Sequence, residues 1–284
     1  MKMNKRIPVI LALVLALCFA VAGCSGGGEE AKTPENPVIR LSTTTSVNDS
    51  GLLPYLQPEF EKDTGYKLEI TSNGTGAAIK LGETGDADCL LVHAKASEEE
   101  FINAGYGLER IPFMYNFFVI AGPEGDPAGV KDCKTAEEAF QAIANQKSEF
   151  VSRGDDSGTH KAELKIWEAA EIDPTGQSWY ISAGAGMAAC LNQASERQAY
   201  ILTDKATYLS NKGDLVILME ESEDMKNTYS LIAVNPEKNE GINAEGAQAF
   251  IEWMQSDKAK ELIAKYGEEE YGQPLFYNLE GEAQ

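Results

Sequence analysis

The sequence predicts an α/β protein whose strands form a mainly parallel sheet. Short apolar segments such as Val38–Ser42 and Cys89–Val92 alternate with longer segments in which apolar residues recur at helical spacing. Strands that alternate with helices need crossover connections, which place helices on the faces of a parallel sheet. Polar residues follow several of these strands, and ligands bind such sheets at the carboxyl ends of strands. The same pattern therefore predicts the fold class and the edge of the sheet that carries a site.

Residues 1–23 are predicted to be a secretory signal peptide. Three basic residues precede an apolar run over about residues 9–22, which is shorter than the roughly 20 residues that a membrane-spanning helix needs. The run ends at Gly23-Cys24, which resembles a bacterial lipobox and implies that Cys24 is lipidated. An ordinary signal peptide with an incidental cysteine is the alternative. Residues 24–37 are rich in Gly, Glu and Pro, and are predicted to form a flexible tether.

The composition excludes several classes of partner and site. The formal net charge is −21, so nucleic acid and anionic lipid headgroups are poor partners, and an anion site must rely on local donors. Cys89, Cys133 and Cys190 remain once the signal is removed and Cys24 is lipidated. Their odd number and wide spacing indicate neither a zinc site nor a disulfide framework. We expect buried thiols, with a single bridge as the alternative, and neither a bound metal cation nor a cofactor.

Apolar spacing and capping residues define the elements of the first half of the chain. Asp49 or Ser50 can cap a helix that ends at Gly65, and Pro58 is expected to kink it. The predicted strands are residues 38–42, 66–71, 89–92, 111–121 and 149–152. The predicted helices are the one before Gly65, a short helix after residues 72–76, and residues 98–104 and 135–146.

The second half continues the alternation. Apolar residues at 162, 166, 167 and 170 share one helical face, and this helix stops before Asp173-Pro174. The further predicted strands are residues 200–202, 215–219 and 229–234. The further predicted helices are a helix after residues 184–186 that ends near 196, and residues 204–210, 244–255 and 257–266, before a less regular tail.

The segment Phe150–His160 carries the clearest functional signal. Ser157 is a good N-cap, so Gly158 and Thr159 present free backbone N–H groups at the positive end of a helix. Arg153 lies beside them, and an arginine next to a helix N-terminus suits an oxyanion. A surface ion pair between Arg153 and the neighbouring aspartates is the alternative.

Three further polar clusters lie at predicted junctions between strands and helices, at residues 43–46, 72–76 and 184–187. Each has an ordinary explanation on its own, as a helix N-cap or a tight turn, and residues 72–76 lack the third glycine of a dinucleotide-binding fingerprint. Four such clusters at matching positions of one sheet favour a shared binding site.

Two of these motifs resemble a known family. Residues 42–53 (Ser-Thr-Thr-Thr-Ser-x-x-Asp-Ser-Gly-Leu-Leu) and 152–160 (Ser-Arg-Gly-Asp-x-Ser-Gly-Thr-His) are similar to motifs of the TupA family, the tungstate-binding lipoproteins of ABC importers. Gly186-Met187 and residues 202–209 extend the likeness, which covers nearly the whole mature chain. Phosphate-binding proteins share a shorter pattern of an arginine followed by Ser-Gly-Thr.

The resemblance implies a two-lobed type II periplasmic-binding-protein fold. Each lobe is then a mainly parallel sheet flanked by helices, and two crossover strands act as hinges, which we place near residues 117–121 and 231–235. Lobe I comprises residues 38–118 and 233–284, and lobe II comprises residues 119–232. We expect a monomer that captures tungstate between the lobes and delivers it to an ABC permease and its ATPase.

The resemblance also implies the site residues. Thr44 and Arg153 carry the binding, one from each lobe. The further expected donors are Thr43, Thr45, Ser72, Thr75, Ser157, Gly158, Thr159 and Gly186.

The protons on the ligand decide which groups the site needs. Tungstate is a bare tetrahedral dianion at neutral pH, so a selective site needs donors only, whereas phosphate carries protons that a carboxylate can accept. We expect Asp155 to hold Arg153 or to cap the turn, and Asp156 to be exposed. A carboxylate that faces the anion would favour phosphate. Molybdate stays an alternative because the sequence does not report the size of the cavity.

Two other functional classes have weaker support. Residues 154–158 resemble the nucleophile loop of a serine protease, but an additional aspartate interrupts the motif, and neither His93 nor His160 is placed as a base for Ser157. A structural lipoprotein would need none of the converging donors. We therefore predict a protein that is not an enzyme. We expect it to lie outside the cytoplasm, anchored to the cell membrane by its N-terminal lipid alone, with tungstate or a related oxyanion as ligand and no nucleic acid partner.

Overall fold

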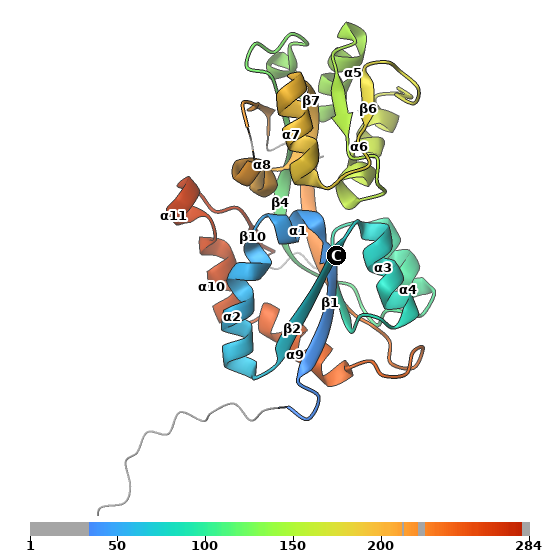
Figure 1. Cartoon of the computed structure of the whole chain (residues 1–284), viewed down its shortest axis with the longest axis vertical. Coiled ribbons are helices and arrows are strands. Elements are labelled where there is room, and N and C mark those ends of the chain that lie inside the picture. The colour runs from blue at the N-terminus through green and yellow to red at the C-terminus, as the bar shows by residue number, and fades with distance from the viewer. Residues whose placement is uncertain (1–33, 212, 221–224, 280–284) are drawn as a thin grey trace, which may run out of the picture. The chain divides into compact units, whose positions relative to one another are not determined.

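The computed structural model describes residues 34–211, 213–220 and 225–279. The predicted signal peptide, Cys24 and most of the predicted tether lie outside these residues. Across the described ranges, no helix has the length and apolar character needed to cross a membrane. Strands and helices alternate along the chain (Figure 1), which confirms the predicted α/β class.

One sheet runs through the molecule, and strand β4 (Ile111–Gly122) passes between its two halves. We call residues 34–117 and 225–279 lobe I, and residues 118–220 lobe II. In lobe I the strands are ordered β2-β1-β3-β9-β4, with β1 parallel to β2 and β3, and β9 antiparallel to β3 and β4. These strands are β1 (Val38–Thr44), β2 (Lys67–Asn73), β3 (Cys89–Val92) and β9 (Lys226–Ala233), and the short β10 (Tyr277–Asn278) pairs with β4.

The lobe II part of the sheet has the order β4-β7-β5-β6. Strand β5 is parallel to β6 and β7, whereas β7 and β8 are antiparallel to β4. The strands are β5 (Phe150–Ser152), β6 (Tyr180–Ser182), β7 (Tyr200–Asp204) and β8 (Val216–Met219). The sequence pattern did not predict β6, because it is only three residues long and none of them is buried.

Two segments connect the two halves of the sheet. Residues up to Phe117 of β4 pair with β9, and residues from Phe118 pair with β7, so the pairing partner of β4 changes between these two residues. Strand β9 already pairs with β4 at Lys226, so the chain returns to lobe I between Met219 and Lys226, upstream of residues 231–235. The apolar pattern did not predict the start of β9, because its first three residues, Lys-Asn-Thr, are polar.

Helices cover both faces of each half of the sheet (Figure 1), and four apolar clusters fill the space between. In lobe I, α2 (Leu52–Thr64), α9 (Ala244–Met254) and α10 (Asp257–Lys265) share one cluster, and α3 (Thr75–Thr84) and α4 (Lys95–Asn103) share another. In lobe II, α5 (Ala136–Gln146) and α6 (Gly158–Ala169) share one cluster, and α7 (Met187–Arg197) and α8 (Lys205–Asn211) contribute to the other.

The remaining helical segments are short: α1 (Thr45–Asp49), the 3₁₀ turn η1 (Val130–Asp132) and α11 (Glu268–Tyr271). Pro58 lies inside α2, which continues to Thr64. All three cysteines in the described part of the chain are free thiols; Cys89 and Cys190 are buried, and Cys133 is half-buried.

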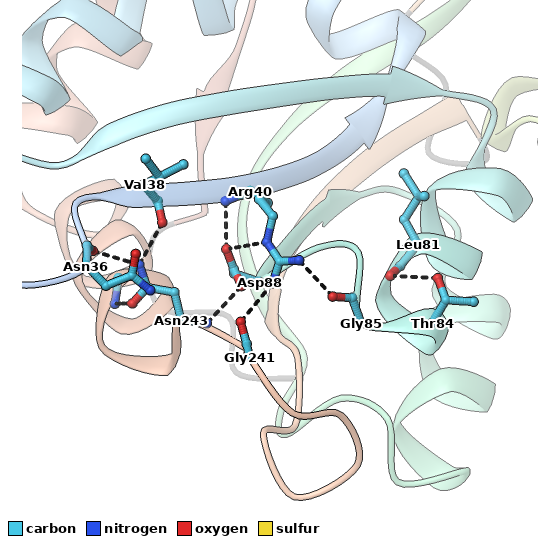
Figure 2. A network of polar contacts seen from close by, with 10 residues as sticks. Asn36, Val38, Arg40, Leu81, Thr84, Gly85, Asp88, Gly241 and Asn243 are labelled. Atoms are coloured by element: carbon cyan, nitrogen blue, oxygen red, sulfur yellow. Dashed lines mark hydrogen bonds and ion pairs between the residues drawn. The ribbon is translucent and has the colours of Figure 1, made fainter.

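A buried ion pair closes the end of lobe I where β1 begins (Figure 2). The Asp88 carboxylate accepts hydrogen bonds from the Arg40 backbone N–H, the Arg40 guanidinium and the Asn243 backbone N–H. The guanidinium also donates to the carbonyl groups of Gly85 and Gly241. A buried charge is stable only when it is paired and hydrogen-bonded, and Asp88 meets both conditions. These bonds tie the start of β1 to the α3–β3 turn and to the segment before α9.

Candidate functional site

The four predicted polar clusters lie at the carboxyl ends of strands, where helices begin. Helix α1 follows β1 directly, and α3 follows β2 with Gly74 as its N-cap. Helix α6 follows β5 with Ser157 as its N-cap, and α7 follows β6 with Gly186 as its N-cap. Paired parallel strands bring these starts together in each lobe, because Thr44 of β1 is aligned with Asn73 of β2. The N-termini of helices carry free N–H groups and partial positive charge.

Contacts between the lobes bring the two sets of helix starts together. The Arg153 Nη2 atom of lobe II donates to the Thr45 hydroxyl of lobe I at 3.2 Å. The Thr207 hydroxyl of lobe II donates to Asp204 at 2.6 Å and lies 3.3 Å from the Ser46 carbonyl oxygen of lobe I. A Cβ atom added to Gly74 would lie 3.3 Å from the Asp155 carbonyl oxygen, so the β2–α3 turn contacts residues 153–157, which we call the arginine loop. The structure therefore places the threonine-rich loop, residues 43–46, and the arginine loop against one another.

Arg153 is the charged centre of this junction, and it is only 2% exposed. The Asp155 Oδ2 atom accepts hydrogen bonds from its Nε and Nη2 atoms, and Asp155 Oδ1 accepts one from the Ser157 backbone N–H. Burial acts to raise the pKa of Asp155, but the bonds from Arg153 and Ser157 outweigh it and hold this pKa below its usual value. Asp155 thus holds Arg153 and caps the turn, as predicted, and both of its oxygens are occupied.

Three predicted donors are buried hydroxyls that lack a partner. The Ser72 Oγ, Thr75 Oγ1 and Thr159 Oγ1 atoms are shielded from solvent and make no hydrogen bond to the described residues. Buried polar groups are nearly always hydrogen-bonded, so an unpaired one needs an explanation. Ser72 is the second-last residue of β2, Thr75 begins α3, and Thr159 lies in the first turn of α6. A bound anion would supply the missing acceptor to all three.

The other predicted donors are partly committed to the protein. The Ser157 hydroxyl accepts from the His160 backbone N–H and is hydrogen-bonded to the Asp155 carboxylate, and the Thr45 hydroxyl accepts from Arg153. The Thr44 hydroxyl lies 3.1 Å from the Ser46 hydroxyl. The Thr43 hydroxyl donates to the Leu91 carbonyl in the neighbouring strand at 2.8 Å. The expectation that Thr43 offers its side-chain proton to a ligand is therefore not met.

The two glycines differ in how closely they approach the site. A Cβ atom on Gly158 would lie 2.5 Å from the His93 ring, so the start of α6 packs directly on lobe I. Gly186 faces open space, whereas Gly184, two residues earlier, donates its N–H to the Arg153 carbonyl, and Ser182 packs against Gly154. Gly158 thus lies at the junction, and Gly186 lies beside it.

Sequence reasoning missed a buried polar network that adjoins Thr44. His93, Asn116, Asn227 and Asp204 connect Ser46 to Thr207 through hydrogen bonds across both lobes. Polar side chains inside apolar strands, such as Asn116 in β4, were the signal in the sequence. Only the tertiary structure shows that these residues face one another.

The described residues do not support a hydrolase or a site for a metal cation. The His160 ring accepts from the Asp156 N–H, and neither histidine ring is hydrogen-bonded to the Ser157 hydroxyl. Asp156 is exposed, as predicted, and pairs with Lys161. Among the described residues, no group of three or more His, Cys, Asp or Glu is arranged to hold a metal ion. A groove of about 1400 Å³ borders His93 and Gly158, but a tetrahedral oxyanion is far smaller than this groove.

Comparisons with known proteins agree with this geometry. The family model described as the PBP superfamily domain matches residues 31–258. The chain is 50% identical over 280 residues to "Tungstate-binding protein TupA" of Peptoclostridium acidaminophilum, an alignment that covers 96% of this chain and 98% of the relative. It is 41% identical over 247 residues to the "Putative ABC transporter anion-binding protein" of Haloferax volcanii, covering 84% of this chain and 72% of the relative.

Two solved structures extend the likeness to the fold. The structure of "the tungstate ABC transporter from Geobacter sulfurreducens" has a TM-score of 0.75 and 44% identity, covering 81% of this chain and 98% of that one. The tungstate-binding protein TupA of Desulfovibrio alaskensis has a TM-score of 0.73 and 42% identity, covering 86% of this chain and 99% of that one. These relatives are tungstate-binding and transport proteins rather than enzymes. The chain therefore belongs to the PBP superfamily and, within it, to the TupA family.

Proposed function

We propose that this protein captures tungstate between its two lobes and delivers it to the permease of an ABC importer. The observation that carries the proposal is the set of unpaired buried hydroxyls of Ser72, Thr75 and Thr159 at the junction that holds Arg153. The names of the TupA relatives supply the identity of the anion.

Helix N–H groups and the guanidinium of Arg153 can only donate, so these groups suit an anion that carries no proton. Hydroxyl groups can donate to such an anion or accept from a protonated one. Asp155 is turned to Arg153 and Ser157, and Asp156 is exposed and paired with Lys161, so we expect neither carboxylate to accept a proton from a ligand. The proposed ligand contacts come from Arg153, Thr44, Thr45, Ser72, Thr75, Ser157, Gly158, Thr159 and, from the side of α7, Gly186.

The proposal includes the site of action. We infer that Cys24, which lies outside the described residues, carries the lipid that anchors the protein to the outer face of the cell membrane. The negative net charge keeps the rest of the chain away from anionic headgroups. The permease and its ATPase are the proposed protein partners.

Another tetrahedral oxyanion, molybdate or phosphate, is the second candidate ligand. The Haloferax volcanii relative is named for an anion without further specification, which supports this broader reading. Calorimetric titration with tungstate, molybdate, sulfate and phosphate tests both candidates in one series. Tungstate is expected to bind at least about a hundredfold more tightly than sulfate or phosphate, a difference of ~2.7 kcal/mol. Binding of none of the four would overturn the proposed function.

A further inference from the structure

His93 lies where the two lobes meet, next to the proposed anion site. It follows β3, and its ring packs against Tyr229 of β9 at 4.9 Å between ring centroids and against Gly158 at the start of α6. The residue is 8% exposed. Its Nε2 atom is 3.0 Å from the Ser46 hydroxyl, and Ser46 in turn contacts Thr44. His93 is thus one hydroxyl group away from a proposed ligand of the anion.

A carboxylate at the far end of the network fixes the direction of every hydrogen bond. Asp204 Oδ1 accepts from the Thr207 backbone N–H at 2.9 Å, so this oxygen carries no proton. The Asn116 group that faces it at 3.3 Å is therefore the amide nitrogen, which donates. The Asn116 amide oxygen then accepts from the Asn227 amide nitrogen at 2.9 Å. The Asn227 amide oxygen therefore faces His93 Nδ1 at 2.8 Å. An amide oxygen only accepts, so His93 Nδ1 carries a proton.

The same logic continues to the anion site. A neutral His93 with its proton on Nδ1 has a lone pair on Nε2, which accepts the Ser46 hydroxyl proton. The Ser46 oxygen then accepts the Thr44 hydroxyl proton. All donors in the chain from Thr44 to Asp204 point away from the anion site.

A ligand without protons conflicts with this direction. Thr44 can bind such an anion only if it turns its proton away from Ser46, which would leave two oxygens 3.1 Å apart with no proton between them. If the Thr44 and Ser46 hydroxyls both reverse, Ser46 donates to Thr44. The bond between Ser46 and His93 is then kept only if His93 Nε2 donates to the Ser46 oxygen. The Nδ1 proton cannot move to Nε2, because the Asn227 nitrogen is held by Asn116 and by the Tyr229 hydroxyl. A second proton on the ring is the remaining route.

We propose that His93 takes up one proton from solvent when a bare oxyanion dianion binds, which reverses the Ser46 and Thr44 hydroxyls so that Thr44 donates to the anion. One N–H bond forms at Nε2, and the two hydroxyl protons rotate without being lost. A ligand that carries its own proton donates to Thr44 and leaves His93 neutral. His93 therefore determines whether the site accepts a bare or a protonated anion. This inference rests on the proposed function.

The charges around the ring fit this coupling. Burial, with a contribution from the positive charge of Arg153, lowers the pKa of His93 to about 4, so the ring is neutral without a ligand. Asp155 is paired with Arg153, and Asp204 is separated from the ring by two amides. The groove that His93 borders is lined by both signs of charge, the cations Lys95, Arg110, Lys161, Lys165 and Lys226 and the carboxylates Glu100, Glu137 and Asp156. The Tyr229 hydroxyl, which accepts from the Asn227 amide nitrogen, also contacts Ser46. A dianion bound beside Thr44 adds two negative charges close to the ring, and so favours a proton on it.

Calorimetry of tungstate binding in buffers of different ionisation enthalpy measures the proton uptake directly. Near neutral pH the protein is expected to take up close to one proton per tungstate, and its affinity falls about tenfold for each unit that the pH rises. In His93→Gln the amide nitrogen can donate to Ser46 without a solvent proton. This variant is expected to bind tungstate with no proton uptake and an affinity independent of pH. His160→Gln is the matched control and keeps the uptake.

Nitrogen NMR gives an independent readout, because the chain contains only two histidines. The His160 Nδ1 atom accepts from the Asp156 N–H, so a neutral His160 carries its proton on Nε2, opposite to His93. Addition of tungstate is expected to protonate His93 Nε2 and to leave His160 unchanged. Tungstate binding without proton uptake, or uptake that persists in His93→Gln, would overturn this inference alone. Absence of tungstate binding would overturn the proposed function as well.

Discussion

The carboxylate of Asp155 contacts one edge of the Arg153 guanidinium, at 3.2 Å from Nε and 2.5 Å from Nη2. The Nη1 atom makes no hydrogen bond to the described residues and is left for a ligand. An arginine held in this way loses little freedom when it binds an anion, because its orientation is already fixed. Asp155 also balances the charge of Arg153, so we expect an anion at this site to be bound mainly through hydrogen bonds rather than through net charge.

Removal of Arg153 tests the centre of the site. Arg153→Ala is expected to weaken tungstate binding by at least about a hundredfold, since charge-assisted hydrogen bonds in a buried site are worth about 1.5–3 kcal/mol each. Calorimetric titration measures the loss. Lys161→Ala, which breaks the exposed pair with Asp156, is the control and should change affinity less than about threefold. Equal affinities for the two variants would rule out the proposed role of Arg153.

Two threonines at the junction should respond to the same substitution in opposite ways. Thr75→Val removes an unpaired buried hydroxyl, so it should leave the ligand-free protein as stable or more stable and weaken tungstate binding about tenfold. Thr43→Val leaves the Leu91 carbonyl without its donor, so it should lower the free energy of unfolding by about 1–3 kcal/mol with little change in affinity. Chemical denaturation and calorimetry of both variants check the contrast. A Thr75→Val variant that binds as tightly as the wild type would remove Thr75 from the site.

Ligand binding should raise the thermal stability of the protein. A ligand present at about 100 times its Kd stabilises the folded state by ~2.7 kcal/mol, which corresponds to a Tm increase of about 5–11 °C for a chain of this size. Thermal scans with tungstate, and with sulfate as the comparison anion, measure the shift. Arg153→Ala should show no shift at the same concentration. A Tm that does not move in the wild type would count against tungstate as the ligand.

Glu163, a buried residue of α6, should make the free energy of unfolding depend on pH. Burial raises the pKa of Glu163 to about 7, although hydrogen bonds from Tyr180, Ser152 and Trp167 oppose the shift. The folded protein therefore holds a proton that the unfolded chain releases at its ordinary pKa of about 4.3. The stability from this group is full below that pKa and is lost as the pH rises through about 7.

Glu163→Gln isolates this effect, because its amide oxygen can still accept from Tyr180 and Trp167. Over the interval from the ordinary pKa to about 7, the variant is expected to lose the decline in stability that the wild type shows. Urea denaturation at a series of pH values provides the comparison. Parallel pH profiles for the two proteins would show that Glu163 does not titrate as stated.

The arginine loop could be predicted from the sequence because its contacts are local. Ser157 caps α6 and Asp155 binds Arg153 within a few residues of chain, so neighbouring residues determine both contacts. The elements with strong apolar periodicity, such as α5 and α9, were predicted to within a residue or two for the same reason.

The network around His93 was not readable because its members come from five separate elements. Asn116 and Asn227 lie 111 residues apart and meet only because β9 pairs with β4 at its polar start. The resemblance implies that Thr43 is a donor in the site, whereas its register opposite Leu91 of β3 lets its hydroxyl donate to the Leu91 carbonyl. Register and pairing partner, rather than residue type, decide these contacts.

The clamp between Arg40 and Asp88 has a consequence for the order in which the molecule is made. Arg40 is bonded to the carbonyl of Gly241, 201 residues later, so this bond cannot form until the segment before α9 has been made. The core of lobe II, by contrast, is drawn from one continuous stretch. Since segments close in sequence meet soonest, the second lobe can fold first and the C-terminal part completes the first. The Asp88 carboxylate therefore gains its last backbone donor, the Asn243 N–H, late in the assembly of lobe I.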